Sequence, residues 1–522
     1  MKKRDCYLIL VMLVNIAIYA QPADTEIDSV VNHNDWGWTS IVQKNDLVTL
    51  ATVPAIGARI MQYDLGDHQN MYVNPGEIGK TYTPARGGLH GFGGYVMWPA
   101  PQYRWPGTWP PPPVLDYGAY ASQIICDTPD SNCLFVSSDI EQWVAPDIRF
   151  ERKMTLYTGT TRVRLEQSMI NEASETRNWS VWDVTQTIAK NPRDNYWVYF
   201  AINPNSEHGE DGVYFRNNQN SDAWVGEVAP GIYGVKFRPE GKKLFADTHE
   251  GWIAYVDEGA GKAYIKTFPI FEGAEYPGDN GGGRVQVYLG TANYEVELAS
   301  PMVDLAPNGG RYTFTQNWYL TSMNGPILSV TDMGAAAKRL YRDGSTGHLI
   351  GTYGVFYIGS AKLIAVDANG AALAESASFD VTPLETWNID ATMELPDATA
   401  GVKIMVSDAN GDEIGQLDSV TMEQLTAVTE QKRSPGTLVL AQNYPNPFNP
   451  ETSISYGLPS VQEIRLSVYD VTGRLISTLV HEKQSEGDHT VLFNGEDLAS
   501  GIYLIRLESE HQVMTRRMVL LK

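Results

Sequence analysis

The sequence predicts an all-β protein, with one large antiparallel β-sandwich followed by two small β-sandwiches of immunoglobulin-like type. Short runs of alternating apolar and polar residues recur, for example at 47–51, 150–156 and 285–289, and this period of two is typical of half-buried strands. Asn, Gly, Asp and Pro separate the runs and supply turns. Between residues 24 and 319 no apolar pattern of helical period reaches ordinary helix length, and no blade-length repeat indicates a propeller.

Length and charge narrow the class of protein further. The chain has 522 residues, which favours about three domains. Its residues are 43% hydrophobic and 11% aromatic, enough to build large cores. The formal net charge is −23, and such an acidic chain disfavours nucleic acid, whose binding depends on Lys and Arg neutralising phosphates. We therefore expect no nucleic-acid partner.

The first twenty residues have the pattern of a secretory signal peptide. Lys2, Lys3 and Arg4 precede an apolar run over 7–19, and Ala20 supplies a small residue at the expected cleavage position. The apolar run is short for a membrane span, and no later segment is apolar enough to cross a bilayer. We expect residues 1–20 to be removed and the mature chain to lack a transmembrane segment.

Composition divides the rest of the chain into four segments. Residues 21–325 hold the long series of strands that predicts the large sandwich. Residues 326–428 begin with a short helix, expected at 333–341, and continue as a β-sandwich spacer. Residues 429–436 are polar and end in Pro-Gly, which is typical of a linker. Residues 437–522 form the last small β domain.

This last segment contains four sequence blocks, at 440–452, 468–474, 498–503 and 517–522. In this order they resemble the C-terminal sorting domain of the type IX secretion system. The resemblance implies export to the periplasm and then across the outer membrane, with the type IX machinery as a partner. We expect the protein to be secreted or displayed at the cell surface.

The segment Gly87–Tyr120 is unusually rich in Gly, Pro and aromatic residues. Because Pro cannot donate into a sheet ladder, we expect neither a regular helix nor a central strand here, but a long ordered loop. Flat aromatic faces beside a few polar groups suit sugar rings, and a Trp- and Pro-rich plug over the end of the core is the alternative. The residues of this segment that we expect to bind substrate are Trp98, Gln102, Trp105 and Trp109.

Motifs across residues 35–320 resemble a bacterial family of unknown function whose fold is similar to galactose mutarotase, a β-supersandwich. They lie at 53–60, 98–102, 109–113, 182–186 and 294–297. The resemblance implies a sugar-related ligand. Mutarotases use a His general acid and a Glu general base, but the strand expected to carry the His has none at 178–186. This departure puts mutarotase activity itself in question.

Strand periodicity sorts two groups of candidate residues. Trp182 and Gln186 share one face of a strand and offer a stacking plane and an amide, while Asp183 points the other way. A Trp packed in the core, with the Gln bonded to backbone, is the alternative. Glu295 and Glu297 also share a face about 7 Å apart, a spacing that suits a general acid and base if burial raises one pKa. A solvated strand face is the alternative.

Two further residues are candidates for the site. His90 lies among glycines, and its side chain has an unperturbed pKa near neutrality, so we pair it with Glu297 as the acid and base to test. Arg59 follows a turn at Gly57 and could bind a carboxylate or sugar hydroxyls, or form a buried salt bridge.

The two cysteines after the signal peptide, Cys126 and Cys133, flank a turn-like sequence. In an exported protein we expect them to form a disulfide that closes a hairpin, with free thiols as the alternative. No His, Cys or Asp spacing predicts a metal site, and no phosphate-binding loop is present. We expect no cofactor.

Together these patterns predict an exported protein that binds carbohydrate in an aromatic-lined cleft of the large sandwich. Three hypotheses stay open: a carbohydrate-active enzyme with epimerase, lyase or hydrolase chemistry, a non-catalytic surface adhesin, and specifically a polysaccharide lyase. The lyase needs a base, such as His90, and a cation for a uronate, such as Arg59 or Arg104. The sequence names neither the sugar nor the reaction.

Overall fold

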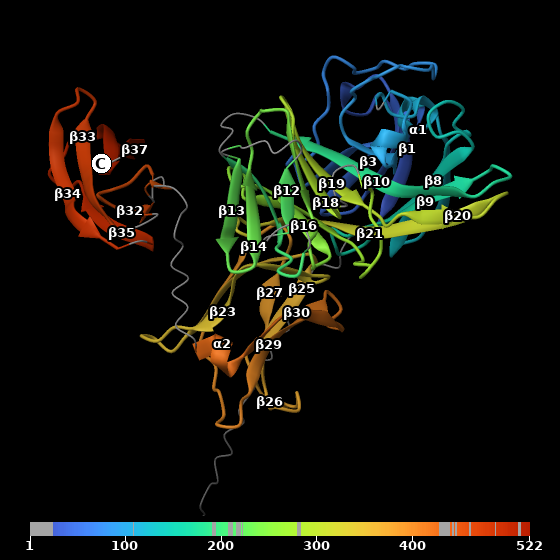
Figure 1. Cartoon of the computed structure of the whole chain (residues 1–522). Coiled ribbons are helices and arrows are strands. Elements are labelled where there is room, and N and C mark those ends of the chain that lie inside the picture. Colours follow the sequence, from blue (N-terminus) through green and yellow to red (C-terminus); the bar gives the residue numbers. More distant parts are fainter. Residues whose placement is uncertain are drawn as a thin grey trace, which may run out of the picture.

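The computed structural model describes residues 24–426 and 439–522, apart from 108, 190–194, 207–211, 216–220, 222, 279–282, 441–442, 444–445, 459–460, 486 and 510–512. The expected signal peptide and linker lie outside the described residues. Within them, α-helix is limited to α1 (Pro113–Tyr117) and α2 (Met422–Thr426), and none is long and apolar enough to cross a membrane. The prediction of an all-β fold is confirmed (Figure 1).

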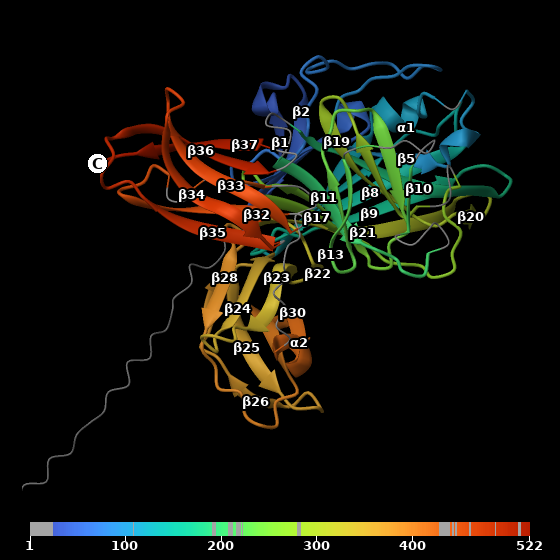
Figure 2. The same ribbon diagram turned by 60° about the vertical axis from the view of Figure 1, so that its left-hand side comes forward.

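Two large antiparallel sheets form the first unit (Figures 1 and 2). The 11-stranded sheet contains, in spatial order, β1 (Glu26–Val31), β2 (Thr39–Lys44), β3 (Val48–Val53), β4 (Arg59–Leu65), β5 (Tyr95–Ala100), β10 (Arg177–Ile188), β19 (Asn293–Ala299), β18 (Val285–Leu289), β15 (Lys242–Ala246) and β12 (Val213–Phe215), with β20 (Val303–Leu305) paired to β10. The 10-stranded sheet contains β13 (Trp224–Ala229), β14 (Ile232–Lys236), β11 (Tyr196–Ala201), β16 (Trp252–Asp257), β17 (Lys262–Thr267), β21 (Gly310–Ser322), β9 (Val163–Asn171), β8 (Ile148–Tyr157), β7 (Ser131–Ser137) and β6 (Ala121–Asp127). A disulfide joins Cys126 of β6 to Cys133 of β7.

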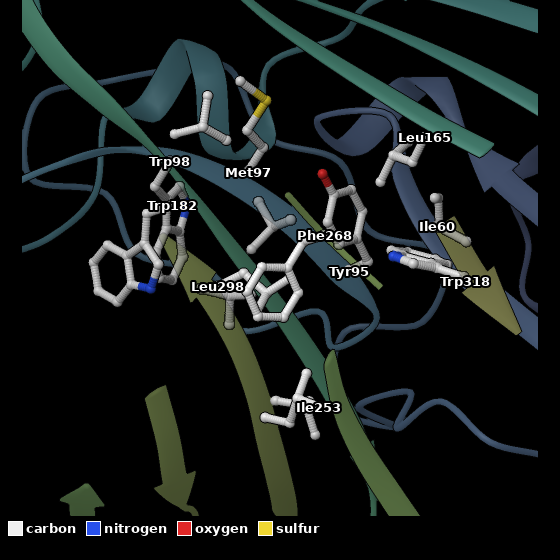
Figure 3. Packing of buried hydrophobic residues seen from close by; sticks show 14 of the residues in the cluster. Ile60, Tyr95, Met97, Trp98, Leu165, Trp182, Ile253, Phe268, Leu298 and Trp318 are labelled. Atoms are coloured by element: carbon white, nitrogen blue, oxygen red, sulfur yellow. The ribbon is translucent and has the colours of Figure 1, made fainter. Parts of the chain in front are cut away.

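Alternate residues of the central strands face the space between the two sheets. Tyr95 of β5 packs against Trp318 of β21 with ring centroids 5.0 Å apart (Figure 3). On β10, Asp183 accepts hydrogen bonds from Lys266 of β17 and, at 2.6 Å, from Gln316 Nε2 of β21. The neighbouring even-numbered residues of β5 and β10 therefore face away from the second sheet, and this outer face carries the candidate site.

The segment Gly87–Tyr120 is not a long loop, so this expectation is wrong. It contains β5, which lies in the middle of the 11-stranded sheet, and the helix α1. Backbone N–H groups along β5 point alternately toward β10 and away from it. Pro99 has no N–H, and it occupies a position whose N–H would point away from β10. There β4 pairs with β5 only at Ile60 and Tyr95, so Pro99 interrupts no ladder.

Residues 329–421 form a second, smaller sandwich. One sheet contains β22 (Ser329–Thr331), β23 (Gly334–Arg342), β24 (Leu349–Val355) and β28 (Trp387–Ala391). The other contains β26 (Ala372–Glu375), β25 (Gly359–Val366), β29 (Gly401–Asp408) and β30 (Glu413–Thr421), with β27 (Phe379–Val381) on β25. The helix expected at 333–341 is wrong, since strand β23 occupies it. Pairing with β22 and β24 overrides the helix propensity of its alanines.

This second sandwich packs on the outer face of the 10-stranded sheet. Tyr319 of β21 stacks on Phe356 at 4.1 Å between ring centroids, and Ile327 and Ala335 join the same buried cluster as Tyr199. Figures 1 and 2 show this unit, in yellow and orange, against the large sandwich. A shared apolar core therefore holds the two units together, on the sheet that does not carry the candidate site.

The C-terminal unit is a third small sandwich with its own core. Its strands are β31 (Val439–Leu440), β32 (Glu451–Leu458) and β35 (Gly487–Asn494) in one sheet, and β34 (Leu475–Gln484), β33 (Gln462–Asp470), β36 (Gly501–Ser509) and β37 (Val513–Leu520) in the other.

The ion pair of Asp183 and Lys266 is fully buried between the large sheets. Removing one partner leaves a buried charge without compensation, so we expect Lys266→Met to lower the free energy of unfolding by about 3–5 kcal/mol. Chemical denaturation of the variant measures this loss. The double variant Asp183→Asn/Lys266→Met should recover most of it, and a double variant as unstable as the single one would show that the pair does not act as a unit.

Candidate functional site

A cavity of about 520 Å³ opens on the outer face of the 11-stranded sheet, within the size range of small-molecule sites. The structure brings many of the residues singled out in the sequence to its wall. These are Arg59, His90, Trp98, Gln102, Trp109, Trp182, Gln186 and Glu295. The other lining residues are Leu89, Gly91, Asp116, Lys243 and Tyr288.

Strand register places a row of polar side chains across the floor of this cavity. Gln186 of β10 lies opposite Glu295 of β19, Glu295 opposite Tyr288 of β18, and Tyr288 opposite Lys243 of β15. Residues opposite one another in an antiparallel pair present their side chains on the same face. These four residues therefore form one continuous stripe, called the polar row below.

Glu295 is the acidic member of the polar row. Its Oε1 accepts hydrogen bonds from Gln186 Nε2 at 2.7 Å and Asn293 Nδ2 at 3.2 Å. Burial raises the pKa of Glu295 to about 8, the negative charge of Glu297 adds to this effect, and Lys243 opposes it. The carboxyl group therefore holds its proton to a higher pH than an exposed glutamate does.

Glu297 lies behind the cavity wall rather than in it. Its side chain is fully buried, and its Oε2 accepts hydrogen bonds from Lys243 Nζ at 2.7 Å and from Trp182 Nε1 at 2.6 Å. The Lys243 ammonium also lies 4.4 Å from the Trp182 ring centroid. Glu297 therefore holds two lining residues, Trp182 and Lys243, in position without lining the cavity itself. Of the two glutamates, Glu295 is the one that faces the cavity.

Aromatic rings form the other part of the wall. Trp98 of β5 lies opposite Trp182 of β10, and their rings meet edge to face at 5.2 Å (Figure 3). Trp109 is 44% exposed and meets Trp98 at 5.9 Å. Trp105 is only 1% exposed, with its Nε1 donating to Pro99 O at 3.0 Å. Trp105 is therefore a core residue that supports the other rings, as the alternative of an aromatic plug describes.

A buried ion pair borders the aromatic wall. Arg59 Nη2 donates to Asp116 Oδ1 of α1 at 2.5 Å, and Trp98 Nε1 donates to the same oxygen at 2.9 Å. Burial raises the pKa of Asp116, and the positive charge of Arg59 opposes the shift. Arg59 Nη1 also donates to Gly93 O at 3.1 Å. Of the two interpretations of Arg59, the structure shows the salt bridge.

His90 lies at the mouth of the cavity, between two tyrosine rings. It stacks on Tyr82 with 3.4 Å between ring centroids and meets Tyr117 edge-on at 4.8 Å. Gln102 lines the cavity from a 3₁₀ helix, Gln102–Arg104.

In the described part of the chain no group of three or more His, Cys, Asp or Glu side chains could hold a metal ion.

Three of the polar lining residues were not singled out in the sequence: Asp116, Lys243 and Tyr288. Of these three, only Asp116 could have been found from the sequence. A carboxylate flanked by Leu115 and Tyr117 in an apolar segment predicts burial, and a buried carboxylate requires a partner. Lys243 and Tyr288 lie in ordinary strands, and the pairing of β15 with β18 and of β18 with β19 brings them to the site.

Residues 442–521 match the model of the secretion system C-terminal sorting domain. This match confirms the resemblance seen in the last segment of the sequence. It marks the protein for type IX secretion, so the protein is secreted or held at the cell surface. No curated protein matches the chain.

Solved structures similar to this chain include proteins of the galactose mutarotase type. A putative aldose 1-epimerase from Klebsiella pneumoniae is 10% identical, with 59% of this chain and 86% of that chain covered and a TM-score of 0.42. A galactose mutarotase-like protein from Clostridium acetobutylicum is 11% identical, with coverage of 58% and 99% and a TM-score of 0.36. One from Lactobacillus casei is 11% identical, with coverage of 54% and 99% and a TM-score of 0.37.

The raised pKa of Glu295 makes stability depend on pH. In the unfolded chain this carboxyl ionises near its ordinary pKa, so the folded state binds the extra proton between about pH 4.5 and 8. Relative to Glu295→Gln, the wild-type protein should therefore lose stability as pH rises through this window, by roughly 4 kcal/mol at pH 8. Thermal unfolding of both proteins at pH 5 and pH 8 tests this, and parallel curves would contradict the shift.

A second prediction concerns the cause of the shift. Glu297→Gln removes the negative neighbour and leaves Lys243 as the nearest charge, so the pKa of Glu295 should fall toward its ordinary value. Carbon-13 NMR of the glutamate carboxyl groups follows this titration directly. An unchanged pKa would assign the shift to burial alone.

Proposed function

We propose that this exported protein binds carbohydrate in the cavity between the aromatic wall and the polar row. The observation that carries the proposal is this juxtaposition: Trp98, Trp109 and Trp182 line the same cavity as Gln186 and Glu295. Indole faces can stack on the C–H faces of sugar rings, and hydroxyl groups need nearby donors and acceptors. Export to the cell surface or medium would bring the site to extracellular glycans.

The orientation of the tryptophans supports a ligand-binding role for two of them. The indole N–H groups of Trp98 and Trp182 donate to Asp116 and Glu297, which fixes both rings before any ligand arrives. A preorganised wall loses little conformational entropy on binding. Trp109, with 44% of its surface exposed at the mouth, offers the ring that a ligand would cover most.

The dimensions of the floor favour more than one sugar ring. Four residues separate Trp182 from Gln186 along β10, which corresponds to about 13 Å in a strand. Across the strands, the polar row extends from β10 to β15 through two intervening strands. A short oligosaccharide, lying along β10 with one end on the polar row, fits these dimensions.

The affinity of the Trp109→Ala variant for an oligosaccharide tests the proposal. The full chain is screened against neutral and acidic oligosaccharides, and the best ligand is titrated by calorimetry into the wild type and the variant. Because Trp109 would lose its stacking contact, we expect the affinity to fall at least tenfold, about 1.4 kcal/mol.

The matched control is Trp197→Ala, which removes a half-buried tryptophan of β11 in the 10-stranded sheet. It should leave the affinity unchanged. Equal losses in both variants, or an affinity that Trp109→Ala does not alter, would place binding elsewhere. A folded protein that binds none of the glycans would contradict the proposed function itself.

A further inference from the structure

The basic side chains on the cavity wall already have acidic partners. The basic residues among those that line it are Arg59, His90 and Lys243. Arg59 and Lys243 are buried, and they form ion pairs with Asp116 and Glu297 respectively. His90 lies at the mouth and interacts electrostatically with Asp116. Among the described lining residues, a ligand therefore meets no buried cation that lacks a carboxylate beside it.

The ammonium group of Lys243 is enclosed on several sides. Its Nζ donates to Glu297 Oε2 at 2.7 Å and lies 4.4 Å and 5.4 Å from the ring centroids of Trp182 and Phe245. To pair with a ligand carboxylate instead, it would have to leave Glu297. That side chain is fully buried, and its Oε1 accepts no hydrogen bond from the described residues. Leaving such a carboxylate without its cation is strongly unfavourable.

Arg59 is held in the same way. Its Nη2 donates to Asp116 Oδ1 at 2.5 Å, and its Nη1 donates to Gly93 O at 3.1 Å. Asp116 is 1% exposed, and its Oδ2 accepts no hydrogen bond from the described residues. Exchange of Asp116 for a ligand carboxylate would leave a second buried charge without compensation. The guanidinium therefore offers a ligand no spare positive charge.

The carboxyl group of Glu295 shows how these surroundings treat a negative charge. Burial and the charge of Glu297 raise its pKa to about 8, against the opposing charge of Lys243. A ligand carboxylate placed beside Glu295 would bring a further negative charge into the same surroundings. Its loss of hydration would not be offset by a new ion pair.

The remaining polar groups suit hydroxyl groups rather than charges. Gln102, Gln186 and Tyr288 line the cavity. An amide and a phenol each offer both a donor and an acceptor, as a sugar hydroxyl does. With the indole ring of Trp109 for stacking, these groups can recognise a sugar that carries no charge.

We propose that the cavity selects uncharged carbohydrate and rejects anionic sugars such as uronates, because Asp116 and Glu297 neutralise its buried cations. This inference rests on the proposed function, since the sugar must first bind in this cavity. It also argues against the polysaccharide lyase hypothesis, which needs a cation for the uronate. Arg59 is paired, and Arg104 lies outside the wall and donates to Asn178 O.

The test compares matched glycans that differ in charge, by calorimetry with the full chain. The pairs are manno-oligosaccharide and oligomannuronate of the same linkage, cello-oligosaccharide and its glucuronate counterpart, and the methyl ester of oligogalacturonate and the free acid. In each pair that binds, the uncharged member should bind at least tenfold more tightly.

Salt separates the cavity from the long-range field of the chain, whose formal net charge is −23. Surface charges are largely screened in about 0.5 M NaCl, whereas buried charges are screened much less. The preference for the uncharged member should therefore persist at this salt concentration. A preference that disappears there would come from the net charge and would overturn the inference.

The variant Glu297→Gln tests the cause of the selection. It keeps an acceptor for Trp182 Nε1 and removes the charge that neutralises Lys243, so the ratio of affinities should shift at least tenfold toward the acidic member of a pair. The matched control is Glu151→Gln, which removes a carboxylate of β8 that pairs with Arg149 and Arg311 in the 10-stranded sheet. It changes the net charge equally and should leave the ratio unchanged.

Each contrary outcome is distinct. An acidic glycan that binds as tightly as its uncharged counterpart overturns the selection but leaves the proposed function intact, and failure to bind any glycan overturns both. A ratio that Glu297→Gln does not alter would contradict the role of the ion pair with Lys243. If this variant does not fold, the comparison of matched glycans on the wild-type protein, at low and high salt, decides alone.

Discussion

The register between β10 and its neighbours determines what the cavity contains. Side chains alternate along a strand, so a shift of one residue would turn Gln186 into the sandwich and Asp183 toward solvent. The interior contacts of Asp183 with Lys266 and Gln316 oppose such a shift, because it would leave the Lys266 ammonium buried without its partner. A fully buried ion pair between the sheets thereby fixes the orientation of the residues on the outer face. The candidate site depends on this constraint.

Charge pairs also organise the outer face. Asp116 with Arg59 borders Trp98, and Glu297 with Lys243 borders Trp182. Each carboxylate accepts one indole N–H, so the polar edge of each ring is bound to protein. Glu295 has no such cation bonded to it, and burial together with the negative charge of Glu297 raises its pKa. Two carboxylates therefore support the wall, and the third, Glu295, accepts hydrogen bonds from the neighbouring amides of Gln186 and Asn293.

Much of this arrangement follows from sequence periodicity, and the rest depends on distant pairing. Alternation placed Trp182 with Gln186 and Glu295 with Glu297, but it could not show that Lys243, far away in sequence, neutralises Glu297. The high Pro content of the segment predicted a loop where β5 lies. A Pro-rich segment can still form a strand of a sheet if the edge that lacks N–H groups is largely unpaired, as it is between β5 and β4. The alanines of β23 favour a helix locally, yet cross-strand partners decide its conformation. The contact of Asp116 with Arg59 could not be predicted from the sequence either, because it depends on where α1 packs.

We propose above that the outer face of the 11-stranded sheet binds a sugar. A crystal structure of the full chain with a bound oligosaccharide tests it most directly. We expect a sugar ring against Trp109 and Trp182, with hydroxyl groups within hydrogen-bond distance of Gln186 and Glu295. An oligosaccharide bound at any other surface, with this cavity holding only solvent at saturating ligand, would contradict it.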